Sequence, residues 1–299
     1  MSTTKKAHVA VLVANLIYGA NFSIAKIAMP AYIKPAGFIL MRAGIASVLF
    51  ILMCSYLKVK DEIERKDYPK MVLLGLFGVA LNQLLFFEGL SRTSNINAAL
   101  IMTSNPILVL VVAALVIREK ITGRRIWGII CGVAGAGGLI LLSKQSGHAS
   151  ALGDTMIFVN AFSYAVYLVM VKPLMKKYSP WILVKYTFIF GTIMVLPFGF
   201  KEVTEIEWSS FTTSVWLSFV FVIIATTFFA YLLNIYGLRM LSPAVVSFYI
   251  YLQPIFATAI SLSVLGEPVT LIQVLACLLI FFGVYLVSGS RLSLVKEKS

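Results

Sequence analysis

The sequence has little charge for its length. Only 12% of its 299 residues are charged, whereas 60% are hydrophobic; soluble domains average about 25% and 45–50%. So little polar surface cannot cover a water-soluble globule, and a mean hydropathy of +0.94 indicates a chain embedded in a membrane. A net charge of +13 would suggest nucleic acid as a partner of a soluble protein. Here the charges cluster in short loops, as in membrane proteins, so we expect no nucleic-acid partner.

The residues of most catalytic and metal sites are also scarce. The three cysteines (Cys54, Cys131 and Cys277) lie in apolar runs, and His8 and His148 are the only histidines. This spacing excludes a disulfide framework and a Cys/His metal site. No HExxH, GxSxG or phosphate-binding glycine loop is present, and no aspartate pair lies at membrane depth. We therefore expect no enzymatic activity, no metal and no cofactor.

Long apolar runs take the place of these motifs. A membrane-spanning helix needs about 20 mostly apolar residues, and the breaks between runs predict an all-α integral membrane protein with ten spans. The predicted spans cover about residues 8–29, 36–57, 71–90, 95–117, 125–143, 152–171, 180–200, 212–236, 242–265 and 269–289.

The loop charges predict the orientation. With the N-terminus in the cytoplasm, 18 lysines and arginines lie in cytoplasmic termini and loops and 4 lie on the other side. This bias places both termini in the cytoplasm. We expect a multi-pass protein of a bacterial or archaeal inner membrane.

The second half of the sequence repeats the first after 148 residues. Pro106 falls on Pro254, Glu119 on Glu267, Thr122 on Thr270 and Gly135 on Gly283. This correspondence predicts one repeat over residues 1–145 and a second over residues 146–299, with five spans each. Five is odd, so the second repeat must enter the membrane from the opposite side. Such inverted repeats are common in secondary transporters, with the substrate site between the halves.

Several motifs carry a resemblance to a known family. They are "NLIYGANFSIAKIAMP" in the first span, "LMRAGIASVLF" in the second, a proline in the fourth span of each half, and the turns "REKIT" and "GEPVT". In this order the chain resembles the EamA-type transporters of the drug/metabolite transporter superfamily. The resemblance implies a permease or exporter of amino acids or other small metabolites.

Ionisable residues at membrane depth are candidates for function. Lys26, Arg42 and Lys185 lie within about two helical turns of a span end, so each could also reach the interface. Small residues follow Arg42, which favours close packing and an inward-facing guanidinium suited to a carboxylate or phosphate. Glu88 is a candidate for proton coupling; the alternative is a surface ion pair with Arg92, four residues later.

Uncharged polar residues form stripes along several predicted spans. Because unpaired amides are costly in hydrocarbon, these faces should meet one another or a wet cavity. Pro106 and Pro254 are predicted to bend their helices. With Arg42, the predicted substrate-binding residues are Asn15, Tyr18, Asn21, Asn82, Asn105, Asn160, Tyr164, Tyr167, Asn234, Tyr249 and Gln253.

The sequence thus predicts a secondary transporter that moves a small polar metabolite by alternating access, an amino acid or related carboxylate being favoured. One alternative is an exchanger of sugar phosphates or nucleotide sugars. Such an exchanger would need clustered inward-facing lysines and arginines, and only three candidates are present. Another is an intramembrane lipid enzyme or scaffold, which would need a catalytic constellation. The expected partners are the substrate and the lipid bilayer. The sequence leaves open a monomer or a homodimer, the substrate, the direction and the coupling ion.

Overall fold

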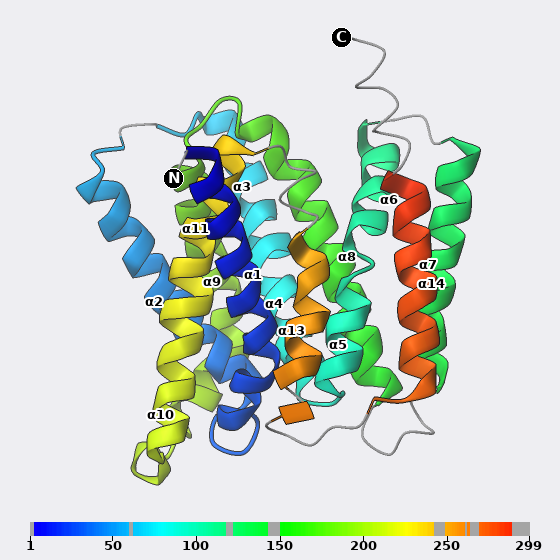
Figure 1. Cartoon of the computed structure of the whole chain (residues 1–299). Coiled ribbons are helices and arrows are strands. Elements are labelled where there is room, and N and C mark those ends of the chain that lie inside the picture. Colours follow the sequence, from blue (N-terminus) through cyan, green and yellow to red (C-terminus); the bar gives the residue numbers. More distant parts are fainter. Residues whose placement is uncertain are drawn as a thin grey trace.

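A computed structural model describes residues 3–59, 62–117, 122–142, 150–241, 249–260, 262–263 and 269–288. All its described elements are helical and form one bundle (Figure 1). The start of α1 and the end of α14 lie at the same end of that bundle. Glu119, Glu267, His148 and the predicted repeat boundary at residue 145 lie outside the described residues.

The first half consists of long helices interrupted at two places. A π-helical stretch, η2, divides the third predicted span, and Thr103 and Ser104 divide the fourth. The elements are α1 (Thr3–Ala28), α2 (Pro35–Tyr56), η1 (Arg65–Asp67), α3 (Tyr68–Gly75), η2 (Leu76–Ala80), α4 (Leu81–Leu90), α5 (Asn95–Met102), α6 (Asn105–Ile117) and α7 (Gly123–Leu142).

The second half follows the same plan. Its elements are α8 (Ala151–Leu174), α9 (Pro180–Thr204), η4 (Trp208–Ser210), α10 (Thr213–Val220), η5 (Phe221–Phe229), α11 (Ala230–Met240), η6 (Tyr249–Leu252), α13 (Gln253–Ile260) and α14 (Leu271–Ser288). A shift of 148 residues carries the first residues of α1, α6 and α7 onto those of α8, α13 and α14. The π-helical η5 likewise overlaps the shifted position of η2.

Seven helices in the described part of the chain are long and apolar enough to cross a membrane. Three shorter apolar helices, over Ile126–Gly138, Tyr249–Ile260 and Leu271–Gly283, lie where the fifth, ninth and tenth spans are predicted. The fold is therefore an all-helical membrane fold, as predicted. The ninth predicted span is described only from Tyr249.

The two prolines stand at helix starts. Pro106 and Pro254 are the second residues of α6 and α13, where the missing N–H of proline costs nothing because no intrahelical bond is due there. In the first half α5 ends at Met102, before the proline. The predicted bend is therefore a change of helix, with a short break before Asn105.

Two pairs of equivalent helices, α2 with α9 and α7 with α14, pack against each other in antiparallel directions. In the pair of α2 and α9, the backbone N–H of Gly37 donates to Glu202, whereas Cys54 at the other end of α2 contacts the carbonyl of Trp181. Helices α7 and α14 pair in the same way at the edge of the bundle (Figure 1). There a Cβ on Gly283 would lie 2.6 Å from the carbonyl oxygen of Gly128. The small residues Gly128, Gly132 and Ala136, at intervals of four, allow this close contact.

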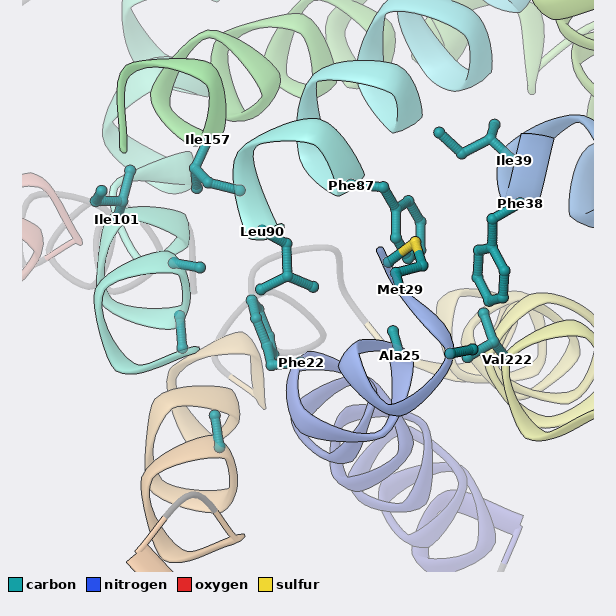
Figure 2. Close-up of a cluster of buried hydrophobic side chains, with 14 of the residues drawn as sticks. Phe22, Ala25, Met29, Phe38, Ile39, Phe87, Leu90, Ile101, Ile157 and Val222 are labelled. Atoms are coloured by element: carbon teal, nitrogen blue, oxygen red, sulfur yellow. The ribbon is translucent and has the colours of Figure 1, made fainter. Parts of the chain in front are cut away.

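The largest apolar cluster connects both halves. Figure 2 shows Phe38 and Phe87 facing each other beside Met29, with Phe22 and Leu90 on the other side of α1's last turns. The ring centroids of Phe38 and Phe87 are 5.6 Å apart. This cluster packs together the end of α1, the start of α2 and the end of α4.

Candidate substrate-binding site

Arg42 is the charged residue in the centre of the described bundle. It follows the start of α2 by seven residues, about 10 Å along the axis, and only 6% of it is exposed. Its Nε donates to Thr227 Oγ1 on η5, and its guanidinium lies 5.1 Å from the ring centroid of Phe87 on α4. Arg42 therefore faces the interior rather than the membrane surface.

The π-helical segment η5 presents Thr227 to Arg42. The Thr227 hydroxyl donates to the carbonyl of Val222, five residues earlier, over 2.9 Å. A π-helical turn widens the helix and is frequent at functional sites. Here the hydroxyl hydrogen goes to the backbone, so the lone pairs of Oγ1 are left to accept from the guanidinium.

No carboxylate pairs with Arg42 among the residues that the structure describes. A buried charge without a counter-ion is costly, and most buried arginines are paired. Phe87 and Thr227 contact the cation without neutralising it. The arrangement can therefore accept an anionic group, to which a guanidinium offers a planar pair of donors.

Tyrosines from three helices lie in the buried region that includes Arg42. Electrostatic interactions connect Tyr18 on α1 with Tyr164 on α8, Tyr231 on α11 and Arg42. Tyr18 accepts a hydrogen bond of 3.1 Å from the amide of Asn234. The ring of Tyr167 stacks on that of Tyr164 with centroids 6.0 Å apart. The predicted residues Tyr18, Tyr164, Tyr167 and Asn234 thus come from both halves and are connected to Arg42 directly or through their neighbours.

Two amide contacts cross between the halves. Gln253 Nε2 donates to Asn15 Oδ1 over 2.8 Å and joins α13 to α1. Asn82 and Asn160 each donate from their side-chain amide to the other's backbone carbonyl, over 3.3 and 2.6 Å. The second contact joins α4 to α8. The helix pairs α1–α13 and α4–α8 are therefore connected by polar groups within the membrane span.

Several buried acceptors have no hydrogen-bond partner. They include Oδ1 of Asn21, Oε1 of Gln83 and Oδ1 of Asn160. Gln83 lies one turn before Phe87, and Asn160 lies one turn before Tyr164, so each shares a helix face with a residue near Arg42. Unpaired acceptors at membrane depth favour a donor, such as a water or a ligand ammonium.

Other candidate residues have partners other than Arg42. Tyr249 accepts or donates a 2.8 Å hydrogen bond with His8, near the start of α1, and the Asn105 amide contacts Met102 in its own segment. Glu88 forms a 2.8 Å ion pair with Arg92 on a partly exposed surface, the alternative that the four-residue spacing offered. Lys185 lies over the ring of Tyr186, and both line a surface recess with Tyr68.

Three residues of the centre escaped the sequence analysis. Thr227, Tyr231 and Phe87 lie in runs that read as ordinary apolar span. The available signal was the pair Thr226–Thr227 inside "VFVIIATTFFAYLL", since hydroxyl side chains in an apolar helix need a partner. Phe87 carried no signal, because an aromatic residue in a span usually packs.

Comparison with known proteins agrees with this architecture. The model of the EamA-like transporter family matches residues 5–141 and again 151–289. The chain belongs to the EamA-like transporter family. It is a secondary transporter and a multi-pass membrane protein, not an enzyme, as the sequence predicted. The double match indicates duplicated halves.

Similar curated proteins share this length. The uncharacterized transporter YyaM of Bacillus subtilis is 26% identical over 283 residues, covering 92% of this chain and 91% of that protein. The uncharacterized inner membrane transporter YicL of Salmonella typhimurium is 23% identical, covering 96% and 97%. A probable terminal-alkyne amino-acid exporter of Streptantibioticus cattleyicolor is 25% identical, covering 64% and 63%. A solved crystal structure with 18% identity has the same fold, with a TM-score of 0.61 over 96% of this chain and 95% of that one.

Proposed function

We propose that this EamA-family transporter moves a small carboxylate, an amino acid in the first place, and that Arg42 binds its carboxylate. The observation that carries the proposal is a buried guanidinium with no carboxylate partner among the described residues, where the two halves meet. A substrate carboxylate would supply the missing counter-charge through two parallel hydrogen bonds.

The unpaired acceptors support a substrate that also carries an ammonium group. Oε1 of Gln83 and Oδ1 of Asn21 and Asn160 are acceptors in need of donors. An α-amino acid has both groups within a few ångströms. The exporter of Streptantibioticus cattleyicolor, named for a terminal-alkyne amino acid, agrees with this choice and with outward transport.

Ten spans in two inverted repeats are the architecture that we propose for this transport. The antiparallel pairing of α2 with α9 and of α7 with α14 supports it, because repeats that enter from opposite sides place equivalent helices in opposite directions. The halves would then rock around the Arg42 centre so that it opens alternately to each side.

Both termini are cytoplasmic in the proposed orientation, and the membrane is a bacterial or archaeal inner membrane. The bias of 18 basic residues to 4 in termini and loops supports this orientation. One relative carries the words "inner membrane" in its name. In this orientation α8 begins, and α1 ends, at the outer face.

Counterflow in proteoliposomes tests the proposed function. Vesicles are loaded with one unlabelled solute from a panel of amino acids, sugar phosphates and organic cations, and entry of the same labelled solute is measured. We expect at least one amino acid to exchange and Arg42→Ala to abolish its exchange. Exchange of sugar phosphates instead would identify the alternative substrate class, and exchange that survives Arg42→Ala would refute the role of Arg42.

A further inference from the structure

A second buried polar group lies at the end of the bundle where α8 begins. Asp154, in the first turn of α8, is completely buried. Its two carboxylate oxygens accept from the Thr93 hydroxyl and, over 3.0 Å, from Nδ2 of Asn97 on α5. In the sequence, Asp154 stands at the very start of the span predicted over 152–171. Packing against α5 buries it nonetheless.

The direction of the hydrogen bonds requires Asp154 to accept. The backbone N–H of Thr270, which can only donate, bonds to Oε1 of Gln273 over 2.8 Å. Gln273 must therefore donate through Nε2, which it does to Oδ1 of Asn97 over 2.7 Å. Asn97 in turn has only its Nδ2 left to donate, and this bond reaches Asp154. A chain of donors that starts at a backbone amide thus ends on the carboxylate, and it suits the ionised form.

Close helix packing keeps the carboxylate in this position. A Cβ on Gly153 would lie 2.9 Å from the carbonyl oxygen of Gly89, and a Cβ on Gly89 would lie 2.8 Å from that of Gly153. Only paired glycines allow α4 and α8 to approach so closely. As a result, the residues after α4, Thr93 among them, reach Asp154.

In the described part of the structure, the charged groups near Asp154 include Lys26 of α1, Glu88 of α4 and Arg92, which follows α4. Lys26, near the end of α1, donates from Nζ to the backbone carbonyl of Thr93, the residue whose hydroxyl binds Asp154. On α4, Glu88 pairs with Arg92 over 2.8 Å, so these two charges neutralise each other. The described groups of α5 and α14 that bond to Asp154 and its chain include the neutral amides of Asn97 and Gln273.

This network connects both halves at one face of the membrane. Lys26, Thr93 and Asn97 belong to the first half, and Asp154 and Gln273 to the second. We propose that Asp154 is the proton-binding group of the transporter and the latch of its outer gate. The proposal rests on the proposed function and orientation, in which this end of the bundle faces outward.

The proposed step is the binding of one proton. Ionised Asp154 holds the outer ends of α5, α8 and α14 together through charge-assisted hydrogen bonds, which are roughly twice as strong as neutral ones. A proton from the outer solution bonds to one carboxylate oxygen and removes the charge, so the bonds from Thr93 and Asn97 weaken and the outer ends separate. The substrate leaves outward; the proton is released inward after the halves reorient. The exchange of one proton for one substrate couples export to the proton gradient.

Two transport assays on one variant test the coupling. In Asp154→Asn the side chain keeps its shape but cannot ionise. We expect it to retain counterflow and to lose substrate accumulation driven by an imposed pH gradient at least tenfold. Glu88→Gln, at the exposed ion pair, is the matched control and should keep both activities. Accumulation that persists in Asp154→Asn, or that is lost equally in Glu88→Gln, would overturn the proposal.

Spin labels test the latch without any substrate. Cysteines replacing Leu152 and Leu271, both more than half exposed, carry the labels on α8 and α14, with Cys54, Cys131 and Cys277 replaced by alanine. We expect the distance between the labels to increase between pH 8 and pH 5, and Asp154→Asn to show the longer distance at both values. A distance that does not respond to pH, or that responds equally in Asp154→Asn, would refute the latch. A wild type without counterflow would refute the proposed transport, whereas the spin labels would still decide the latch.

Discussion

Arg42 of the first half donates to Thr227 of the second, and this contact joins α2 to the π-helical η5 inside the membrane. The two residues are 185 positions apart in the chain. The contact places a positive charge where the halves meet and holds one edge of the guanidinium. In the proposed function, the other edge binds the substrate carboxylate. We therefore expect the contact to determine how well substrate is bound more than how stably the chain folds.

Removing the Thr227 hydroxyl should weaken substrate binding. Thr227→Val keeps the shape but leaves Arg42 Nε without its acceptor, and a hydrogen bond to a charged group contributes about 1.5–3 kcal/mol. We expect KM for the exchanged solute to rise about tenfold or more, with a smaller effect on the maximal rate. Concentration-dependent counterflow measures both.

Thr226→Val is the matched control for that variant. Thr226 is equally buried, but its hydroxyl oxygen has no hydrogen-bond partner. Replacing this hydroxyl by a methyl group removes no bond, so KM should remain within about twofold and stability should be unchanged or higher. A larger effect at Thr226 than at Thr227 would contradict the contact between Arg42 and Thr227.

Replacing Arg42 by methionine should separate stability from transport. The buried charge has no carboxylate partner among the described residues, and an apolar side chain of similar volume is often neutral or stabilising at such a position. We expect Arg42→Met to keep or raise the midpoint of thermal unfolding in detergent. Counterflow should fall at least about tenfold, as expected for the loss of a charged hydrogen-bonding partner. A variant Arg42→Met that keeps wild-type counterflow would contradict the role of Arg42 in binding the substrate carboxylate.

The α7–α14 contact predicts that the stability cost of a Gly→Ala substitution depends strongly on which glycine is replaced. A Cβ on Gly283 would lie 2.6 Å from the Gly128 carbonyl oxygen, whereas one on Gly137 would meet nothing within 4 Å. We expect Gly283→Ala to cost about 1–3 kcal/mol through overpacking. Gly137→Ala should be neutral or slightly stabilising, because alanine favours the helix. Thermal unfolding of both variants in detergent measures the difference, and equal midpoints would contradict the packing.

An ion pair between two loops predicts an acid-dependent loss of stability. Lys177 Nζ lies 2.6 Å from Glu64 and 2.6 Å from Asp67, so it connects the loop after α8 with the loop after α2. Hydrogen bonds from Lys177 and then Lys66 lower the pKa of Glu64. Since the folded pKa lies below the unfolded value of about 4.3, this stabilisation is present above that pH. It is lost as the pH falls through the folded pKa.

Lys177→Met tests this linkage. The variant should unfold at a lower temperature than wild type at pH 7, and the difference should shrink as the pH falls below about 4. Lys176→Met, next to it, is the control and should behave as wild type, since Lys176 forms no ion pair in the described structure. Unfolding midpoints measured in detergent across this pH range decide the case. A difference that grows on acidification would contradict the linkage.

The sequence by itself determined the membrane class, the approximate position of the helical segments, the repeat register and the family. Hydropathy and residue spacing are local properties that can be read along the chain. Apolar runs of this length, separated by polar loops, indicate membrane-spanning helices. The register of Asn105 with Gln253 was visible because a proline follows each of them, 148 residues apart. The stripe of Asn15 and Tyr18 likewise followed from helical spacing.

Only the tertiary structure decided which polar groups meet. Arg42 could have reached the membrane surface; the packing of α2 against α9 and η5 turned it inward, onto Thr227. Asp154 reads as a span-end residue, and the close approach of Gly89 and Gly153 brings Thr93 to it. Glu88 is as deep in its apolar run as any acid, yet it pairs with Arg92 at a partly exposed surface. The sequence shows how far along a helix a residue lies. Which face of that helix is covered by a neighbouring helix depends on contacts between residues far apart in the chain.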